Sequence, residues 1–205
     1  MKLTARIDTD FRCMESYFHK LFVLLQEARA EEKAAPLEAH DYDADESQAT
    51  YHGFSHFIKP DMLMNIYSLV DFWMNEICEY HRKKMNLSLG SRDIKGQNEL
   101  QARHKYLSTY ADLDLSTVQD NYNRLDDLRK VRNSFMHGGG HVASGREQDF
   151  AGITGIVLLG SLIVVENIFI YNTLEHAKTY LLAAAQAQPL VSTKTFESAA
   201  RPSAD

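Results

Sequence analysis

The sequence is poor in residues that break or cross-link a chain. Its 205 residues include four prolines and ten glycines, too few for a loop-rich β-sandwich and compatible with long helices. The two cysteines, Cys13 and Cys78, lie far apart and form no CxxC pattern. This excludes a disulfide framework or a zinc site built from cysteines alone, and it indicates a reducing compartment.

The sequence also lacks a membrane-length apolar run, a secretory leader and an excess of basic residues. Its strongest apolar run, 153–165, is too short to span a bilayer, and residues 1–10 contain no apolar signal-peptide segment. With 22 basic and 28 acidic residues, the net charge is −6, which excludes a protein that coats nucleic acid through its overall field. We expect a soluble, cytoplasmic protein that binds no membrane and holds any nucleic acid locally.

What is present is apolar periodicity typical of helices. Over the first 35 residues, apolar side chains recur every three or four positions and predict one helix, capped by Thr9 or Asp10 and ended by Pro36. These positions are Ile7, Phe11, Met14, Phe18, Leu21 and Leu25. Residues 38–52 are acidic and aperiodic, which predicts an exposed loop. Residues 1–59 are therefore expected to form an extension of a helix and an acidic loop.

A second helix is predicted to begin at Pro60, because proline suits the first helical turn and Asp61 suits the positive end of the helix dipole. Its apolar stripe consists of Leu63, Ile66, Val70, Trp73, Ile77 and Tyr80. Arg82, Lys83 and Lys84 follow the stripe. They either complement the negative end of the helix dipole or bind phosphate, and both interpretations stay open.

Three further helices are predicted, over 97–110, from Ser116 to the glycines at 138–140, and from Asn167 to Pro189. Residues 86–96 form a connector. Ser116 and Gln119 have the spacing of a capping box, in which each side chain bonds an amide at the start of the helix.

Two β-rich runs flank Gly160 and Ser161, which favours a hairpin with a tight turn over the alternative of one buried helix. The expected fold is mainly α: an antiparallel helical bundle with a small β-hairpin before its last helix. Residues 60–188 form the main domain of this fold, and 189–205 form a mobile tail.

Residues 128–140 carry the side chains best suited to catalysis. At 100° per residue, Arg132 lies about 40° from Leu128, at the border of the buried stripe, while Asn133 and His137 lie about 140° and 180° away on an exposed ridge. Imidazole transfers protons near neutral pH, and arginine stabilises charge on a phosphorane-like transition state. RNA supplies its own nucleophile, the 2′-OH, so this trio suits RNA cleavage without a metal or cofactor.

The Arg-Asn-x3-His pattern, late in an amphipathic helix and followed by glycines, resembles the HEPN family (higher eukaryotes and prokaryotes nucleotide-binding domain). The run 68–78 is similar to the early helix of that family, and the resemblance covers 61 to about 182. It implies a HEPN-like bundle, a homodimer in which two Arg-x(4–6)-His motifs meet, and a metal-independent ribonuclease of a toxin–antitoxin or antiviral defence system. RNA would be the substrate, and a cognate antitoxin would be a further partner.

The resemblance implies Arg132 and His137 as the catalytic pair and Asn133 as the residue that orients them, with Asp71 in support. The phosphate-binding candidates are Arg82, Lys83, Lys84 and Arg129.

Two alternatives remain open. His137 also fits a structural role at the last helical carbonyls, with Arg132 paired to Asp127 or Asp71. The chain also fits a catalytically inactive HEPN-like dimer that acts as a scaffold or binds nucleotides or partners. The net charge and the glycines, which stand where many active members have a tyrosine, favour this class, whereas the basic stretch 82–105 favours the enzyme.

Overall fold

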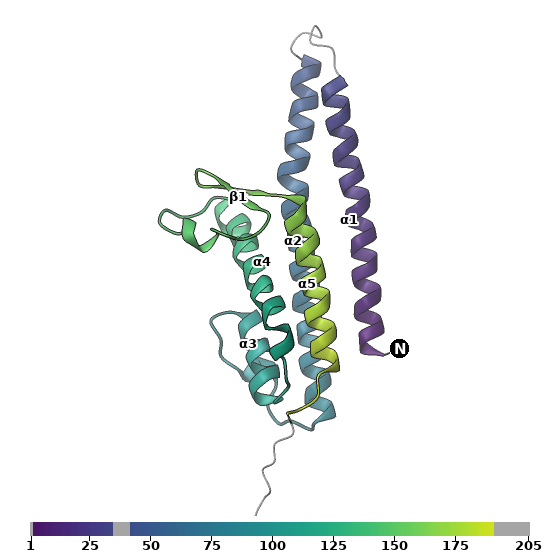
Figure 1. Cartoon of the computed structure of the whole chain (residues 1–205), viewed down its shortest axis with the longest axis vertical. Helices are drawn as coiled ribbons and strands as arrows, with labels where there is room; N and C mark the ends of the chain where they lie inside the picture. Colours follow the sequence, from purple (N-terminus) through teal and green to yellow (C-terminus); the bar gives the residue numbers. More distant parts are fainter. Residues whose placement is uncertain (1, 35–41, 191–205) are drawn as a thin grey trace, which may run out of the picture.

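A computed structural model describes residues 2–34 and 42–190, with side chains for 2–30 and 57–190. The described chain is an antiparallel helical bundle with a β-hairpin before the last helix (Figure 1), as the sequence predicts. Its helices are α1 (Leu3–Ala34), α2 (Tyr42–Lys84), α3 (Glu99–Lys105), α4 (Gln119–Gly138) and α5 (Asn167–Gln186). The hairpin consists of β1 (Ile156–Leu159) and β2 (Leu162–Val165). No helix in these ranges has an apolar stretch long enough to cross a bilayer.

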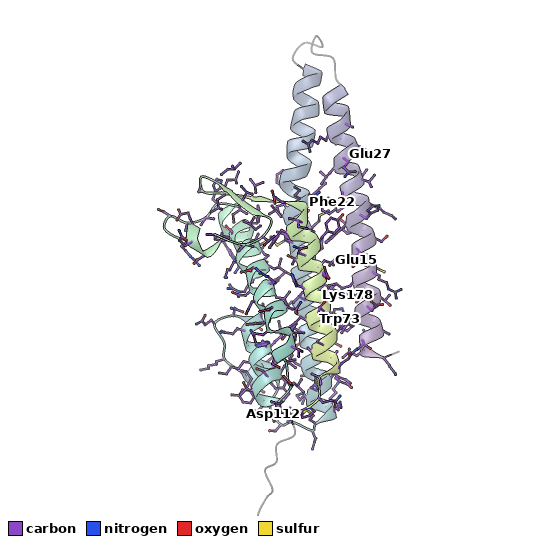
Figure 2. The ribbon with its side chains drawn as sticks, viewed as in Figure 1. Glu15, Phe22, Glu27, Trp73, Asp112 and Lys178 are labelled. Atoms are coloured by element: carbon purple, nitrogen blue, oxygen red, sulfur yellow. The ribbon has the colours of Figure 1, made fainter. Side chains whose placement is uncertain are left out.

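The core lies where α1, α2 and α5 pack along one another. Ile7, Phe11 and Phe18 of α1 are fully buried, and so is Trp73 of α2. This confirms both predicted stripes except at Tyr80, the last position of the second, which is 40% exposed. Figure 2 shows Phe22 and Trp73 among the side chains between these helices, where Lys178 of α5 bonds Asp8 of α1 at 2.8 Å. α1 is therefore part of the bundle core. It begins at Leu3, so the predicted cap at Thr9 or Asp10 is wrong, and the Thr9 hydroxyl instead bonds the carbonyl of Ala5.

The second helix does not begin at Pro60, because α2 runs unbroken from Tyr42 and contains this proline. Residues 42–52, predicted to be loop, are therefore helical, and 35–41 lie outside the described residues. Ala, Glu and Gln in this segment favour helix despite its aperiodic acids. Lys59 also anchors α2 just before the proline, since its Nζ donates to the carbonyl oxygen of Val165 at 2.9 Å. Tertiary contacts on both sides of Pro60 thus outweigh the hydrogen bond that proline removes.

The start of α4 differs from the predicted capping box. Asp114 accepts hydrogen bonds from both the amide and the hydroxyl of Ser116, at 3.0 and 2.6 Å. Gln119 points along the helix and donates to Asn123. Asp114, two residues upstream, accepts the Ser116 amide in an Asx turn in place of Gln119, and the Ser116 hydroxyl donates to it, so the reciprocal Ser–Gln bonds do not form.

The predicted hairpin is confirmed, and the alternative of one buried helix is wrong. Ile156 pairs with Val165 and Leu159 with Leu162 in an antiparallel register. Gly160 takes φ of 60°, a left-handed conformation that suits the two-residue turn. Downstream of α5, Pro189 forms a bridge with Leu113. The start of the predicted mobile tail is therefore held against the bundle, and residues 191–205 lie outside the described part.

A buried histidine makes the stability of this core sensitive to pH. His81 of α2 is 0% exposed, and its Nε2 lies 3.0 Å from the carbonyl oxygen of Ala184 in α5. Nε2–H therefore donates to that oxygen, and Nδ1 is buried without a partner among the described residues. Burial lowers the pKa of His81 below its ordinary value of 6.5, with a smaller effect from Lys84 in the same direction. The unfolded chain thus binds the proton more readily than the folded one.

We expect the free energy of unfolding to fall as the pH is lowered from 7.5 through 6.5 towards 5. Each unit by which folding lowers the pKa contributes about 1.4 kcal/mol to this loss. Chemical denaturation at several pH values measures it. His81→Gln keeps an N–H for Ala184 and removes the titration, so the decline should become shallower, whereas the exposed control His19→Gln should leave it unchanged. Equal slopes in all three proteins would contradict this role of His81.

Candidate functional site

The predicted site lies at the C-terminal end of α4. The helix is held by Leu125, Leu128 and Val131, which are fully buried. It ends at Gly138 and is capped by Gly139, whose φ of 57° is left-handed and whose amide bonds the carbonyl of Ser134. This glycine cap, two residues after His137, stops the helix and turns the chain toward the hairpin.

Arg132 is half-buried and faces α2, at the border of the core as the helical angles predict. Its Cζ lies 5.2 Å from the centroid of the Tyr67 ring, a cation–π distance, and its Nη1 donates to Asn133 Oδ1 at 3.0 Å. Its Nε is buried without a partner in the described part of the chain. Burial, and then the charge of Asp71, raise the pKa of Tyr67 despite this cation. Tyr67 is thus a neutral platform under the guanidinium, and sequence periodicity alone did not single it out.

His137 faces the other way and is exposed. It lines a surface groove of about 510 Å³ between the end of α4 and the loop before the hairpin. The lining residues are Arg129, Lys130, Asn133, Ser134, His137, Gly138, His141, Val142, Ala143, Arg146, Asp149 and Phe150. The groove therefore contains Asn133 and His137 of the predicted trio, together with the phosphate candidate Arg129.

One chain does not bring Arg132 and His137 into a single site. Arg132 is not among the groove-lining residues, since it is held over Tyr67. Asn133 connects the two sides, because it lines the groove and accepts the hydrogen bond from Arg132. The predicted faces of the helix are therefore confirmed, and within one chain the cation and the imidazole stay apart.

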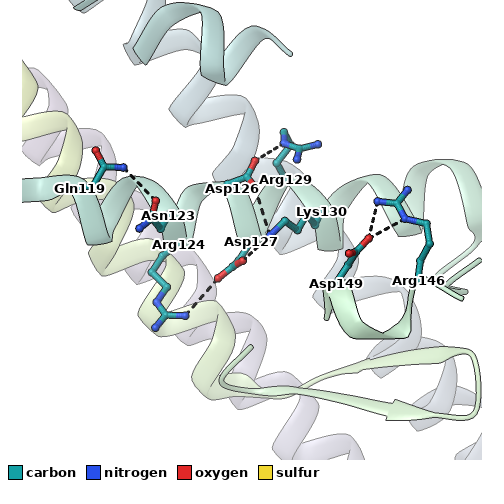
Figure 3. Close-up of polar contacts among 9 residues, drawn as sticks. All are labelled: Gln119, Asn123, Arg124, Asp126, Asp127, Arg129, Lys130, Arg146 and Asp149. Atoms are coloured by element: carbon teal, nitrogen blue, oxygen red, sulfur yellow. Dashed lines mark hydrogen bonds and ion pairs between the residues drawn. The ribbon is translucent and has the colours of Figure 1, made fainter. Parts of the chain in front are cut away.

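Aspartates pair with the cations of the groove (Figure 3). Arg129 bonds Asp126 at 2.7 Å, and Lys130 contacts both Asp126 and Asp127. On the loop, Arg146 bonds Asp149 at 2.7 Å. The Arg146–Asp149 pair is exposed, so water screens it and an incoming polyanion can exchange with this carboxylate at small cost, whereas the pairs of Arg129 and Lys130 are half-buried.

Asp71 does not contact Arg132. Its carboxylate pairs with Arg103 of α3, which also contacts Glu99 at 3.3 Å. The structural alternative that paired Arg132 with Asp127 or Asp71 is therefore wrong, since Asp127 is bound by Arg124 and Lys130. At the border of the core, the guanidinium of Arg132 instead contacts the ring of Tyr67 and donates to the side-chain amide of Asn133.

The basic triplet at the end of α2 lies far from His137, at the end of the bundle where α3 packs (Figure 1). Arg82 makes a two-pronged contact with Glu79, with its Nε at 3.0 and 3.1 Å and its Nη2 at 2.9 Å from the carboxylate oxygens. Lys83 is exposed, and Lys84 lies 5.8 Å from the Tyr80 ring. These residues lie in the last turn of α2, where basic side chains suit the negative end of the helix dipole, and none of them lines the groove of His137.

Sequence reasoning missed four charged or titratable residues of the groove, Lys130, His141, Arg146 and Asp149. Lys130 lies on α4 beside Arg129, and the other three lie in the segment after α4, which carries no periodic signal. His141 is placed by Ser161, whose hydroxyl lies 3.0 Å from Nδ1, and by a bridge to Leu162. Within the described ranges, no three His, Cys, Asp or Glu side chains gather as a metal site.

No family model, curated protein or solved structure matches this chain. The function is therefore inferred from the residues and geometry of the α4 groove itself.

Proposed function

We propose that the protein is a metal-independent endoribonuclease of a defence or toxin–antitoxin system, which cleaves RNA at a site shared by two copies of the chain. The observation that carries the proposal is the exposed His137 in a groove with Asn133 and three cations, Arg129, Lys130 and Arg146. Cations beside an exposed imidazole suit a phosphodiester backbone that needs both charge and proton transfer.

In the proposed reaction, the imidazole of His137 removes the proton from the ribose 2′-OH. The 2′-oxygen then attacks the adjacent phosphorus, and the bond to the 5′-oxygen of the next nucleotide breaks. That oxygen takes up a proton from solvent, and the imidazolium of His137 returns its proton to solvent, so the products are a 2′,3′-cyclic phosphate and a 5′-OH. Arg132 stabilises the charge on the non-bridging oxygens during the attack, and Asn133 orients the guanidinium.

A second copy of the chain supplies what one copy lacks. A two-fold contact between the ends of two α4 helices would bring two copies of Arg132 and His137 to one interface. If Arg132 of one copy meets His137 of the other, the two-fold symmetry makes the reciprocal pair as well. The Nε of Arg132 is buried, but its Nη1 bonds Asn133, which lines the groove. In the proposed dimer, this end of the guanidinium would therefore be the part that reaches the shared site. A cognate antitoxin that covers the same groove would block the enzyme.

The direct test is incubation of the purified protein with single-stranded and structured RNA in the presence of a chelator. We expect cleavage into fragments that end in 2′,3′-cyclic phosphate, and sizing chromatography should show a dimer. Cleavage that needs added metal, or fragments that end in 3′-OH, would contradict the mechanism.

One observation favours a second candidate, a catalytically inactive dimeric scaffold that binds a partner protein. The groove cations are paired with aspartates, and the net charge is −6, so the surface attracts polyanions weakly. A dimer that cleaves no RNA in the same assay would support this candidate against the enzyme.

A further inference from the structure

A second groove, of about 640 Å³, lies between α3 and the first turns of α4. Its lining residues are Lys95, Gly96, Gln97, Gln101, His104, Lys105, Ser108, Gln119 and Tyr122. Tyr122 and His137 are fifteen positions apart on α4, which separates this groove from the His137 groove by roughly 22 Å. The two are different sites.

The buried side of the groove presents an oriented hydrogen-bond donor. The His104 ring stacks on Tyr122 with centroids 3.8 Å apart, and its Nδ1 lies 2.8 Å from the hydroxyl of Tyr180. Tyr180 is fully buried, and within the described chain its hydroxyl has no other acceptor, so it donates to Nδ1. Burial lowers the pKa of His104, which keeps the imidazole neutral at pH 7. The proton therefore sits on Nε2, the nitrogen that remains for a ligand.

Gln101 supplies a second oriented donor. Its Oε1 accepts the backbone N–H of Gln97 at 2.6 Å, which leaves its NH2 group free to donate. The loop that carries Gln97 is packed tightly, since a Cβ on Gly96 would lie 2.7 Å from the backbone nitrogen of Ala102. The side chain of Gln101 therefore starts from α3 and is fixed at its far end by the hydrogen bond to this loop.

The charge of the groove has one sign. Lys95 and Lys105 line it, and no carboxylate is among its lining residues in the described structure. Two other cations of the same basic stretch are paired, Arg82 with Glu79 and Arg103 with Asp71. In a protein of net charge −6, a concave site with two lysines and two fixed neutral donors suits an oxyanion.

We propose that the α3–α4 groove is a binding site for a phosphate group, held by Nε2–H of His104, the NH2 of Gln101 and the ammonium groups of Lys95 and Lys105. The site recognises the phosphate itself, either as the free ion or as the monoester of a small molecule. It is independent of the proposed RNA cleavage, which uses the opposite end of α4.

Inorganic phosphate and adenosine monophosphate are the probes, titrated at pH 7.5 and constant ionic strength. Two-dimensional NMR of the histidine ring nitrogens follows His104, and calorimetry gives the dissociation constant. We expect saturable binding that shifts Nε2 of His104 and not that of the exposed His19. Equal affinity for both probes assigns recognition to the phosphate alone, and tighter monophosphate binding adds contacts from the nucleoside. Failure of both probes to shift His104 would overturn the proposal.

Gln101→Glu is the decisive variant, because it keeps the acceptor for the amide of Gln97 and replaces the donor with a negative charge. We expect it to weaken phosphate binding by about tenfold or more. Gln148→Glu adds the same charge at an exposed position outside the groove and should bind as the wild type does. Equal weakening in both variants would mean that net charge alone attracts the anion, which contradicts a built site. RNA cleavage by Gln101→Glu should stay unchanged, so this result and the test of the ribonuclease are separable.

Discussion

Replacing His137 with alanine is expected to abolish RNA cleavage while the fold and the dimer persist. A positioned acid or base contributes about 10²–10⁴-fold to rate, and His137 is the residue in the α4 groove that we assign to proton transfer. Its side chain is exposed, so its removal leaves no cavity and should leave the free energy of unfolding nearly unchanged. Single-turnover cleavage of a labelled RNA measures the loss.

The matched control is His141→Ala, because His141 is also an exposed histidine and lines the same groove. It should retain most of the activity, since its Nδ1 is engaged by Ser161. Arg132→Ala should lower the rate by about 10²–10³-fold through loss of charge stabilisation. Arg132 also covers Tyr67, so Arg132→Ala can lose stability as well as charge. The melting temperatures of Arg132→Ala and of Arg132→Lys, which keeps the charge, should therefore be compared. Full activity of His137→Ala would remove His137 from the mechanism.

Gly155→Ala is expected to destabilise the protein by about 3 kcal/mol or more, for two reasons that add. Gly155 takes φ of +80°, which L residues rarely adopt. A Cβ there would also lie 2.7 Å from both the backbone nitrogen of Phe169 and Cγ2 of Ile168. A backbone atom of α5 cannot move aside as a flexible side chain would, so the start of α5 or the hairpin must shift. Urea denaturation followed by circular dichroism measures the change.

Gly152→Ala separates the two causes. Gly152 has nearly the same φ, +83°, but a Cβ there meets nothing within 4 Å. It should therefore show the backbone strain alone, about 1–2 kcal/mol. If the two variants lost the same stability, the close approach of Gly155 to α5 would contribute nothing.

Much of the fold was predictable because burial follows helical spacing. The stripes from Ile7 and from Leu63 face the core as predicted, apart from the exposed Tyr80 at the end of the second, since a three-and-four spacing marks one face of a helix whatever it packs against. The hairpin around Gly160 also followed from local chemistry, because a glycine in the turn and β-branched flanks favour that geometry. Asn133 and His137 were placed on the open side of α4 by the same angular argument.

Two of the errors arose where a distant residue decides the local structure. Pro60 reads as a helix start, yet a bond from Lys59 to Val165, 106 residues away, helps hold the helix on both sides of it. Asp71 was predicted to support the Arg132–His137 motif, yet its carboxylate forms an ion pair with Arg103.

Periodic spacing and turn chemistry were enough to assign the helical class, the buried stripes and the exposed face that carries His137. These features depend on residues a few positions apart, whose relative geometry the backbone sets. The partners that lie on other helices came from the packing alone: Arg132 over Tyr67, Asp71 with Arg103, and His104 tied to Tyr180, 76 residues later. Spacing along a helix leaves open which helix lies opposite, and that neighbour determines which cations and donors remain free to bind.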